Sequence, residues 1–310
     1  MKGTINLTRK ADRRSRFKND LPFYIILLPT IIVVFLFSYL PLSGLLLAFK
    51  DYKPKLGIFM SPWTSMGGFE NFVEVFKTPA LSKAIVNTII INLLTLALTV
   101  PLPVVFALLI NEIRNVHFKK VVQTVSYLPH FLSWAAITGM ANVMLNNNGI
   151  ITSILDSLGL PSLLLEKESA FVPIYLFITV WQCLGWDAVI YLASISGISQ
   201  DLYEAAEIDG AGKFTQALKI TVPSLMPTMV MLLILKTGSI LGSNFELVYG
   251  LQNPVAWKME VIGTAVYKYG INQGQYSLAT ALGLMQGLIS LALTFGVNAI
   301  SNKLTNVSMW

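Results

Sequence analysis

Residues 21–49 read LPFYIILLPTIIVVFLFSYLPLSGLLLAF and contain no charged side chain. A helix needs roughly 20 apolar residues to cross the hydrocarbon core of a bilayer, so this stretch is long enough to span it. It is too long for the apolar region of a cleavable signal peptide, which has about 7–15 residues, and no A-x-A site follows it. The sequence therefore predicts a retained transmembrane helix at about residues 22–48.

The composition extends this prediction to the whole chain. Hydrophobic residues make up 54% of the 310 residues and charged residues 12%. An average soluble domain has about 25% charged residues, so the balance is typical of a bundle whose outer surface faces lipid. The single cysteine, Cys183, excludes an internal disulfide and is expected to be a small buried residue.

Basic residues are concentrated before the first apolar stretch. Seven of the 22 Lys and Arg precede residue 21: Lys2, Arg9, Lys10, Arg13, Arg14, Arg16 and Lys18. Because positive residues favour the cytoplasmic side, this cluster predicts a cytoplasmic N-terminus. Contact with anionic membrane lipid is a second use for it. The net charge of +6 therefore gives no indication of nucleic-acid binding.

Six apolar stretches are long enough to cross a membrane. They lie at about residues 22–48, 84–110, 121–145, 171–195, 224–245 and 279–301. With the N-terminus inside, alternation places both chain ends in the cytoplasm. We therefore expect an all-α integral membrane protein with six transmembrane helices in the cytoplasmic (inner) membrane. Residues 1–20 would form a basic cytoplasmic segment and residues 21–310 one six-helix domain.

Two local patterns refine this picture. Pro101 and Pro103 predict a kink in the second helix, because proline removes a backbone hydrogen bond and clashes with the preceding turn. The apolar residues between 150 and 158 recur at helical spacing. They predict a short amphipathic helix that lies at the outer membrane surface.

The usual signatures of enzymes and metal sites are missing from the sequence. The two histidines, His117 and His130, belong to no H-E-x-x-H motif, and there is no C-x-x-C. The string GAGKF at residues 210–214 lacks both the glycine spacing and the hydroxyl of a phosphate-binding loop. We expect no catalytic residue, no metal and no cofactor, and no ATP binding by this chain itself.

The cytoplasmic segment between the fourth and fifth spans has the most informative pattern. Residues 199–211 read SQDLYEAAEIDGA. Asp201 is placed to cap a helix, with Glu204 three residues later in the capping-box position, and Gly210 is placed to end it. This predicts a short, acidic, exposed helix. The small alanines at 205–206 suit close docking in a groove of a partner.

This segment resembles the EAA loop of the membrane subunits of binding-protein-dependent ATP-binding-cassette (ABC) importers. The residues that carry the resemblance are Glu204, Ala205, Ala206, Asp209, Gly210 and Ala211, with Ile220, Pro223 and Pro227 behind them. Residues 244–254 and the ending from Asn302 to Trp310 are similar to the carbohydrate branch of that family. Relatives in that branch take up oligosaccharides or polysaccharide fragments, including uronate-containing ones.

The resemblance implies the type I ABC importer permease fold and a division of labour. Two permease subunits, this chain and a second, homologous one, would form the path, and two ABC ATPase subunits would drive it. An extracytoplasmic binding protein would deliver a carbohydrate. In the family the EAA helix sits in a groove of the ATPase and transmits its motion to the membrane helices. By residue match, Glu204, Ala205, Ala206, Asp209 and Gly210 would form this coupling element, within a loop of about residues 199–227.

Two ionisable residues, Asp187 and Lys236, lie within predicted spans. Each costs about 2.5–3.5 kcal/mol at mid-bilayer on insertion scales, so both should face the interior or a wet cavity. Two interpretations stay open: a structural Asp187–Lys236 ion pair, or contact with sugar, for which nearby rings and polar groups are suited. The candidates for the substrate pathway are Trp181, Gln182, Trp186, Asp187, Tyr191, Asn244 and Gln286. Asn92 and Asn142 are expected to form hydrogen bonds between helices.

A secondary transporter of a small polar solute is the alternative function. That class favours a longer chain with inverted repeats and broken helices, whereas this sequence has six spans and no internal repeat. A membrane-embedded enzyme would need a metal cluster or a nucleophile–base pair, for which two isolated histidines are a poor basis. The permease subunit of an ATP-driven importer therefore accounts for the sequence best.

Overall fold

The computed structural model describes residues 20–159, 168–239, 241, 245–252 and 259–305. In these ranges the regular structure is helical, apart from an isolated antiparallel bridge between Lys50 and Trp63. After the N-terminal helix Asp20–Phe49 come α2 (Gly57–Met60), α3 (Glu70–Lys77), α4 (Pro79–Thr99), α5 (Pro101–Asn111), α6 (Val116–Tyr127), α7 (Trp134–Met144), α8 (Ile150–Ser157), α9 (Glu168–Ser196), α10 (Gln200–Ile208), α11 (Lys213–Gln216), α12 (Val222–Ser239), α13 (Phe245–Leu251), α14 (Ile262–Val266) and α15 (Tyr276–Thr305). The prediction of an all-α protein is confirmed.

Five helical segments are long and apolar enough to cross a membrane. They are Asp20–Phe49, Pro79–Asn111, Ser169–Ser196, Lys213–Gly238 and Tyr276–Lys303. These segments coincide with the first, second, fourth, fifth and sixth predicted spans. At the predicted kink the helix is interrupted, because α4 ends at Thr99 and α5 begins at Pro101.

The third predicted span, residues 121–145, is not one continuous helix. The chain leaves α6, makes a short tight turn at Leu128–Phe131 and starts α7 at Trp134. Pro129 cannot donate a backbone hydrogen bond to the preceding turn, and the Ser133 hydroxyl accepts the Ala136 N–H at 3.2 Å to cap a new helix. The expected single helix was therefore wrong. The count of six crossings and the cytoplasmic position of both ends stay predictions.

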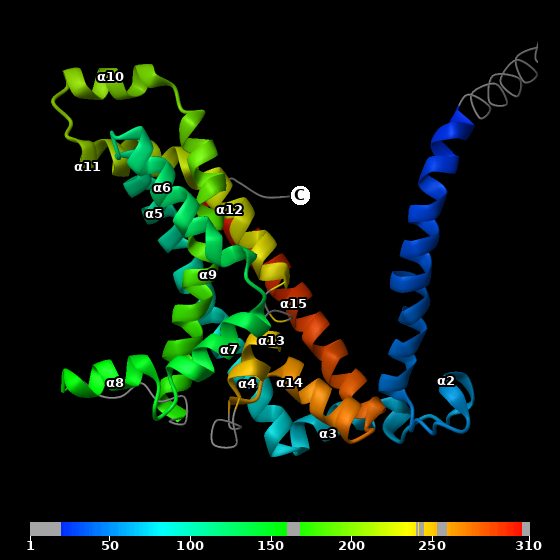
Figure 1. Ribbon diagram of the computed structural model, residues 1–310. Coiled ribbons are helices and arrows are strands. Elements are labelled where there is room, and N and C mark those ends of the chain that lie inside the picture. Colours follow the sequence, from blue (N-terminus) through cyan, green and yellow to red (C-terminus); the bar gives the residue numbers. More distant parts are fainter. Residues whose placement is uncertain (1–19, 160–167, 240, 242–244, 253–258, 306–310) are drawn as a thin grey trace, which may run out of the picture.

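Helix α9 stands at the centre of the bundle. It packs against α4, α5, α6, α12 and α13, while α12 also packs along α15. Figure 1 shows α10 and α11 at one end of the molecule and α3, α13 and α14 at the other. The N-terminal helix diverges from the bundle and meets it near its C-terminal end, at Leu40–Phe49, which packs against α15.

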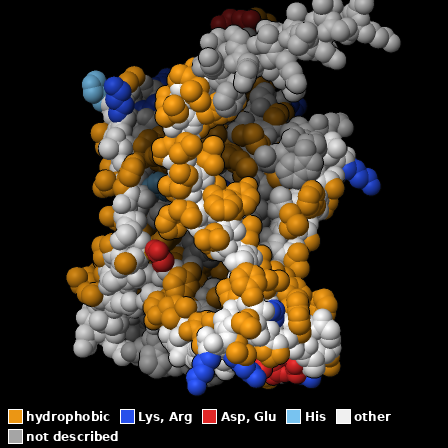
Figure 2. All heavy atoms as spheres, turned by 90° about the vertical axis from the view of Figure 1, so that its right-hand side faces the viewer, with side chains coloured by type: hydrophobic (Ala, Val, Ile, Leu, Met, Phe, Trp, Pro, Cys, Tyr) orange, Lys and Arg blue, Asp and Glu red, His pale blue; other side chains and the backbone are white. Residues whose placement is uncertain are grey.

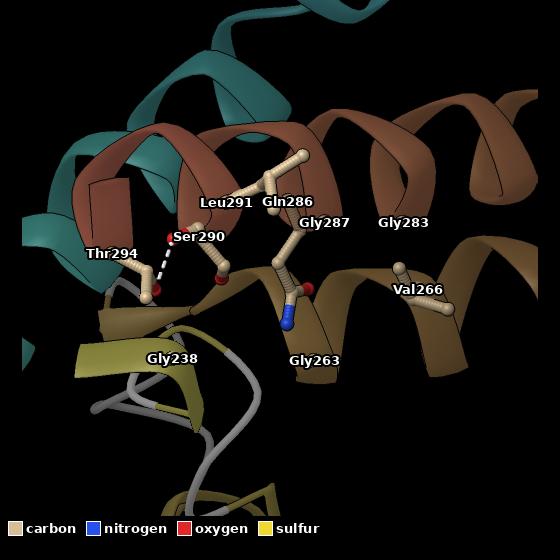
Figure 3. Close-up of a pocket in the computed structure, with 9 residues that line it drawn as sticks. All are labelled: Gly238, Gly263, Val266, Gly283, Gln286, Gly287, Ser290, Leu291 and Thr294. Atoms are coloured by element: carbon tan, nitrogen blue, oxygen red, sulfur yellow. Dashed lines mark hydrogen bonds between the residues drawn. The ribbon is translucent and has the colours of Figure 1, made fainter. Parts of the chain in front are cut away.

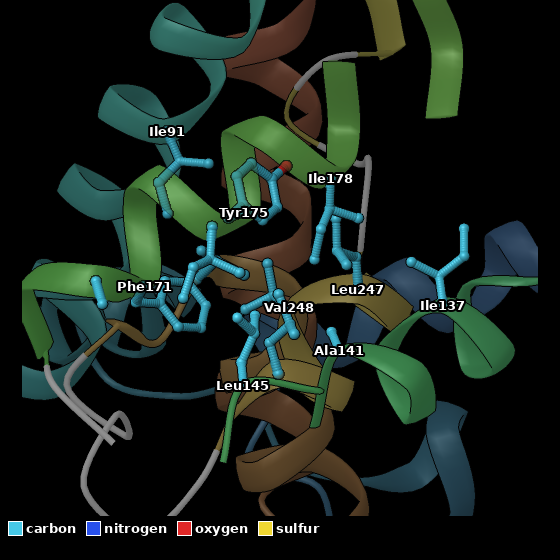
Figure 4. Close-up of a cluster of buried hydrophobic side chains, with 13 residues drawn as sticks. Ile91, Ile137, Ala141, Leu145, Phe171, Tyr175, Ile178, Leu247 and Val248 are labelled. Atoms are coloured by element: carbon cyan, nitrogen blue, oxygen red, sulfur yellow. The ribbon is translucent and has the colours of Figure 1, made fainter. Parts of the chain in front are cut away.

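Buried side chains hold α7, α9 and α13 together at the end of the bundle away from α10. Phe171 and Tyr175 of α9 lie against Leu247 of α13 and its neighbours (Figure 4). Close packing and interhelical hydrogen bonds associate helices in lipid, where water exclusion gives no driving force. Asn142 of α7 donates to the Gly250 carbonyl of α13 at 2.9 Å, as expected of an interhelical asparagine. Asn92 donates to the Thr88 carbonyl within its own helix.

The outer surface of the bundle suits a lipid environment. On the face in Figure 2, hydrophobic side chains cover the middle, and charged ones gather mostly toward the two ends. The predicted short amphipathic helix is α8, which runs across the direction of the long helices (Figure 1). It buries Thr152 and exposes Ile150, Ile154 and Leu158. Its position at the membrane surface stays a prediction.

Candidate functional site

A serine side chain caps the start of helix α10, where the first backbone N–H groups have no partner within the helix. Ser199 has extended backbone angles, and its hydroxyl accepts the Asp201 N–H at 3.3 Å. The prediction that Asp201 caps this helix was therefore wrong. Asp201 lies inside the first turn instead, where its negative charge favours the positive end of the helix dipole.

Gly210 ends α10 as its sequence position predicts. Its φ of +78° is a left-handed conformation that residues with a Cβ rarely adopt. The Gly210 N–H donates to the Glu207 carbonyl at 3.0 Å, and the Ala211 N–H donates to the Ala206 carbonyl at 2.8 Å. These two bonds satisfy carbonyls that the helix leaves open and turn the chain sharply toward α11.

The surface of α10 is exposed at the end of the molecule (Figure 1). Glu204, Ala205, Asp209 and Gly210 are exposed, and Ala206 is half-buried. Apolar side chains are exposed beside them, with Ile208 at 88% of its free surface. Exposed apolar groups next to small and acidic residues are typical of a surface that docks with another protein.

Two contacts connect α10 to the long helix that follows, and a third fixes the turn between them. Glu207 accepts from the Lys213 ammonium at 2.9 Å, and this hydrogen bond holds the pKa of the Glu207 carboxyl below its usual value. The Tyr203 hydroxyl bonds the Thr221 hydroxyl at 2.9 Å. The buried Gln216 donates to the Ala211 carbonyl at 3.0 Å. Helical structure then runs unbroken through α11 to α12, so the segment after α10 extends directly into the bundle.

Deep in the bundle, the two ionisable residues of the predicted spans form an ion pair. Lys236 Nζ of α12 lies 2.6 Å from Asp187 Oδ2 of α9, so the predicted ion pair is present, while contact of Asp187 with sugar stays a prediction. The same ammonium donates to the Thr99 carbonyl at 2.9 Å. In a helix that carbonyl would accept from residue 103, but Pro103 has no N–H. Lys236 therefore satisfies a carbonyl that the kink leaves open and links three helices.

The aromatic and polar candidates on α9 have different surroundings. Trp186 stacks on His130 at 4.6 Å between ring centroids and remains 44% exposed. Gln182 is buried and donates to the His130 carbonyl at 3.3 Å, so it satisfies backbone at the break between α6 and α7. Trp181 is partly exposed, whereas Tyr191 is buried in an apolar cluster. Their predicted roles in the substrate pathway are not tested by this geometry.

A close helix contact that the sequence prediction missed lies at Gly185. A Cβ at this position of α9 would overlap the backbone carbonyl of Ser126 in α6. The absence of a side chain thus allows the two helices to approach closely. The indication of this contact in the sequence was a glycine that lies between Trp181 and Trp186.

A cavity of about 700 Å³ lies between α14, α15 and the end of α12 (Figure 3). Its lining residues are Gly238, Gly263, Val266, Gly283, Gln286, Gly287, Ser290, Leu291 and Thr294. Gln286, predicted as a pathway residue, lines it and donates to the Leu241 carbonyl at 2.7 Å. Gln286, Ser290 and Thr294 contribute polar side chains to a lining that is otherwise made of apolar residues and glycines. Asn244 lies outside the described residues.

The sequence held a signal for this cavity. Residues 283, 287, 290 and 294 follow one another at helical spacing and are small or hydroxylated, so they share one face of α15. None of the described residues forms a cluster of three or more potential metal ligands. The residues that line the cavity are uncharged.

A bundle of long apolar helices, with an exposed short helix at one end and a cavity between helices, is the architecture of a polytopic membrane protein. The chain belongs to the family of binding-protein-dependent transport system inner membrane components, which matches residues 75–306. It is therefore a multi-pass inner-membrane permease subunit of an ABC importer and not its ATPase. This membership decides against the alternative of a secondary transporter.

Individual relatives match over nearly the whole chain. The polygalacturonan/rhamnogalacturonan transport system permease protein YteP of Bacillus subtilis (strain 168) is 38% identical over 283 residues, 90% of this chain and 87% of YteP. Protein LplB of the same organism is 37% identical over 289 residues, 92% of this chain and 90% of LplB.

Solved structures agree with this assignment. A chain of a bacterial alginate ABC transporter, crystallised in complex with an alginate pentasaccharide-bound periplasmic protein, has a TM-score of 0.86 and 34% sequence identity. The match covers 95% of this chain and 99% of that chain. The predicted type I ABC importer permease fold is thereby confirmed.

Proposed function

We propose that this chain is the permease subunit of an importer for an acidic oligosaccharide or polysaccharide fragment. The observation that carries the proposal is the near full-length likeness to an alginate transporter chain, at 34% identity and a TM-score of 0.86. The relative YteP is named for polygalacturonan and rhamnogalacturonan transport, which is again an acidic polysaccharide substrate. Gln286, Ser290 and Thr294 in the cavity beside α15 supply polar groups for sugar hydroxyls along the path.

The proposal assigns the coupling to ATP hydrolysis to α10. Glu204, Ala205, Ala206, Asp209 and Gly210 would contact a groove of one of two ATPase subunits. Three features support this role: the exposure of α10, the sharp turn at Gly210 and the unbroken helical structure from α11 into α12. Movement of α10 would thereby tilt α12 and alter the packing around the cavity.

The N-terminal helix supports the presence of a second permease subunit. None of the side chains in its most apolar window is buried, although the helix has no charge between residues 21 and 49. In Figure 1 it diverges from α15 and leaves an open angle between them. A second, homologous permease in this angle would cover both faces. An extracytoplasmic binding protein would complete the complex.

Reconstitution tests the proposed function. The chain, purified from membranes with its co-purifying permease and ATPase, is placed in proteoliposomes with the matching binding protein and offered trigalacturonate. Uptake should require both ATP and the binding protein. Uptake driven by an ion gradient without ATP, or ATP hydrolysis with no transport of any saccharide, would contradict the proposal.

A charge reversal tests the role of α10. Glu204→Lys should leave membrane insertion and assembly intact while uncoupling ATP hydrolysis from delivered solute, because it places a cation in the docking surface. Glu74→Lys is a matched control, since Glu74 is exposed on α3, at the other end of the molecule from α10. Normal uptake by the Glu204→Lys variant would contradict the docking of α10 on an ATPase subunit and leave the proposed substrate unaffected.

A further inference from the structure

A second cavity, of about 220 Å³, lies beside another face of α14. Its lining includes Tyr249, Gln252, Glu260, Tyr267, Lys268 and Asn272. The 700 Å³ cavity is lined by Gly263 and Val266 of the same helix, and a helix turns by about 100° per residue. The two cavities thus lie beside different faces of α14, which is in the half of the bundle away from α10 (Figure 1).

One wall of the smaller cavity is a fixed aromatic surface. The Tyr249 ring is stacked on Phe245 at 5.4 Å with 19° between the planes, and it meets Tyr267 edge to face at 5.3 Å. Tyr249 still exposes 49% of its surface. An aromatic face carries negative potential and attracts the slightly positive C–H groups of a sugar ring. The cluster therefore offers a rigid platform for a pyranose.

The charged groups of the cavity form an ion pair whose two partners differ in exposure. Lys268 Nζ lies 3.6 Å from Glu260 Oε1, with side-chain exposures of 44% for the lysine and 9% for the glutamate. The carboxylate is thus the inner partner, and its burial raises the pKa of Glu260. The ammonium is the outer partner. An ammonium has three N–H donors, so one acceptor does not saturate it.

The remaining polar side chains of the cavity can form hydrogen bonds with the hydroxyls of a sugar. Gln252 and Asn272 line the cavity, and each side-chain amide both donates and accepts hydrogen bonds. Cavities that take whole drug-sized ligands measure about 300–1,000 Å³. A cavity of about 220 Å³ is therefore matched to a single sugar ring rather than to an oligosaccharide.

We propose that this cavity binds one uronate ring of the saccharide before it enters the larger cavity. The Lys268 ammonium holds the sugar carboxylate, Tyr249 stacks on the ring, and Gln252 and Asn272 bond its hydroxyls. Glu260 repels a sugar carboxylate that lies on its own side of the cavity. The ring is therefore oriented with its carboxylate toward Lys268. This inference rests on the proposed function and adds to it a charge-selecting subsite within the permease.

Equilibrium binding to the permease–ATPase complex in nanodiscs, without the binding protein, tests the subsite. The probes are trigalacturonate and its full methyl ester, which has the same rings and no negative charge. The wild-type complex should bind the acid more tightly. Lys268→Met should weaken binding of the acid about tenfold, equivalent to about 1.4 kcal/mol, and change binding of the ester less than twofold.

Three further variants distinguish loss of the subsite from a general loss of folding or binding. Lys268→Arg keeps the charge and should retain selectivity for the acid. Lys53→Met is the matched control, because Lys53 also lies 3.6 Å from a carboxylate, that of Asp51, and lines neither cavity. It should change neither binding constant. Tyr249→Ala should weaken acid and ester alike, since it removes the shared platform.

The possible failures are distinguishable. Equal affinity of the wild-type complex for acid and ester overturns the subsite, as does an equal or absent effect of Lys268→Met on the two probes. Either result, obtained while ATP-driven uptake of trigalacturonate proceeds, leaves the proposed function standing. Absence of saccharide uptake contradicts the proposed function itself.

Discussion

The link between Lys236, Asp187 and the Thr99 carbonyl gives a quantitative prediction about the stability of the bundle. Lys236→Met keeps the length of the side chain and removes both interactions of the ammonium, at 2.6 and 2.9 Å. Asp187 is then left as a carboxylate of which 20% is exposed. The Thr99 carbonyl also loses its lysine partner, and Pro103 cannot replace it.

The expected loss follows from these two consequences. Removing one partner of a buried ion pair costs about 3–5 kcal/mol, and an unsatisfied buried carbonyl costs about 1–3 kcal/mol. Because both side chains retain partial exposure, at 29% and 20%, we expect a total at the lower end of the summed range, about 4 kcal/mol. Adding Asp187→Leu removes the stranded carboxylate and should restore about 2 kcal/mol of this loss.

The measurement is a double-mutant cycle on the free energy of unfolding in mixed micelles, followed by tryptophan fluorescence as SDS is added. The double variant should be more stable than Lys236→Met alone. Strict additivity of the two single substitutions would show that the residues do not interact energetically. A Lys236→Met variant as stable as the wild type would refute the reasoning from the unsatisfied carbonyl as well.

Two glycine substitutions give further predictions, each with a glycine control. Gly185→Ala should destabilise the bundle by about 1–3 kcal/mol through overpacking against α6, whereas Gly139→Ala, with open space around it, should be neutral or stabilising in the same SDS titration. Gly210→Ala should cost about 1–2 kcal/mol at its positive φ and reduce solute-stimulated ATP hydrolysis. Gly212→Ala, at a φ of −70°, should leave hydrolysis unchanged, and equal rates for these two variants would contradict the role of the α10 turn.

The composition and local patterns of the sequence determined the class of this protein. A charge-free stretch longer than the bilayer core predicts a membrane helix wherever it occurs in the fold, because the cost of placing charge in lipid is local. The end of α10 was likewise predictable, since Gly210 lies only two residues beyond Ile208 and needs no distant partner. The start of α10 was misassigned because two capping residues, Ser199 and Asp201, stand two positions apart.

Only the tertiary structure decided which distant residues meet. Asp187 pairs with Lys236 across 49 residues, and Lys236 reaches a carbonyl 137 residues away. Tyr191 is buried and Trp186 is half exposed. Helical spacing alone does not predict this difference in exposure, because it depends on which neighbouring helices cover each residue. The same holds for both cavities, because α12, α14 and α15 form the larger one, and α13, α14 and the segment Tyr267–Asn272 form the smaller one. Spacing along a helix fixes which side chains share a face, whereas the packing of helices fixes what that face meets.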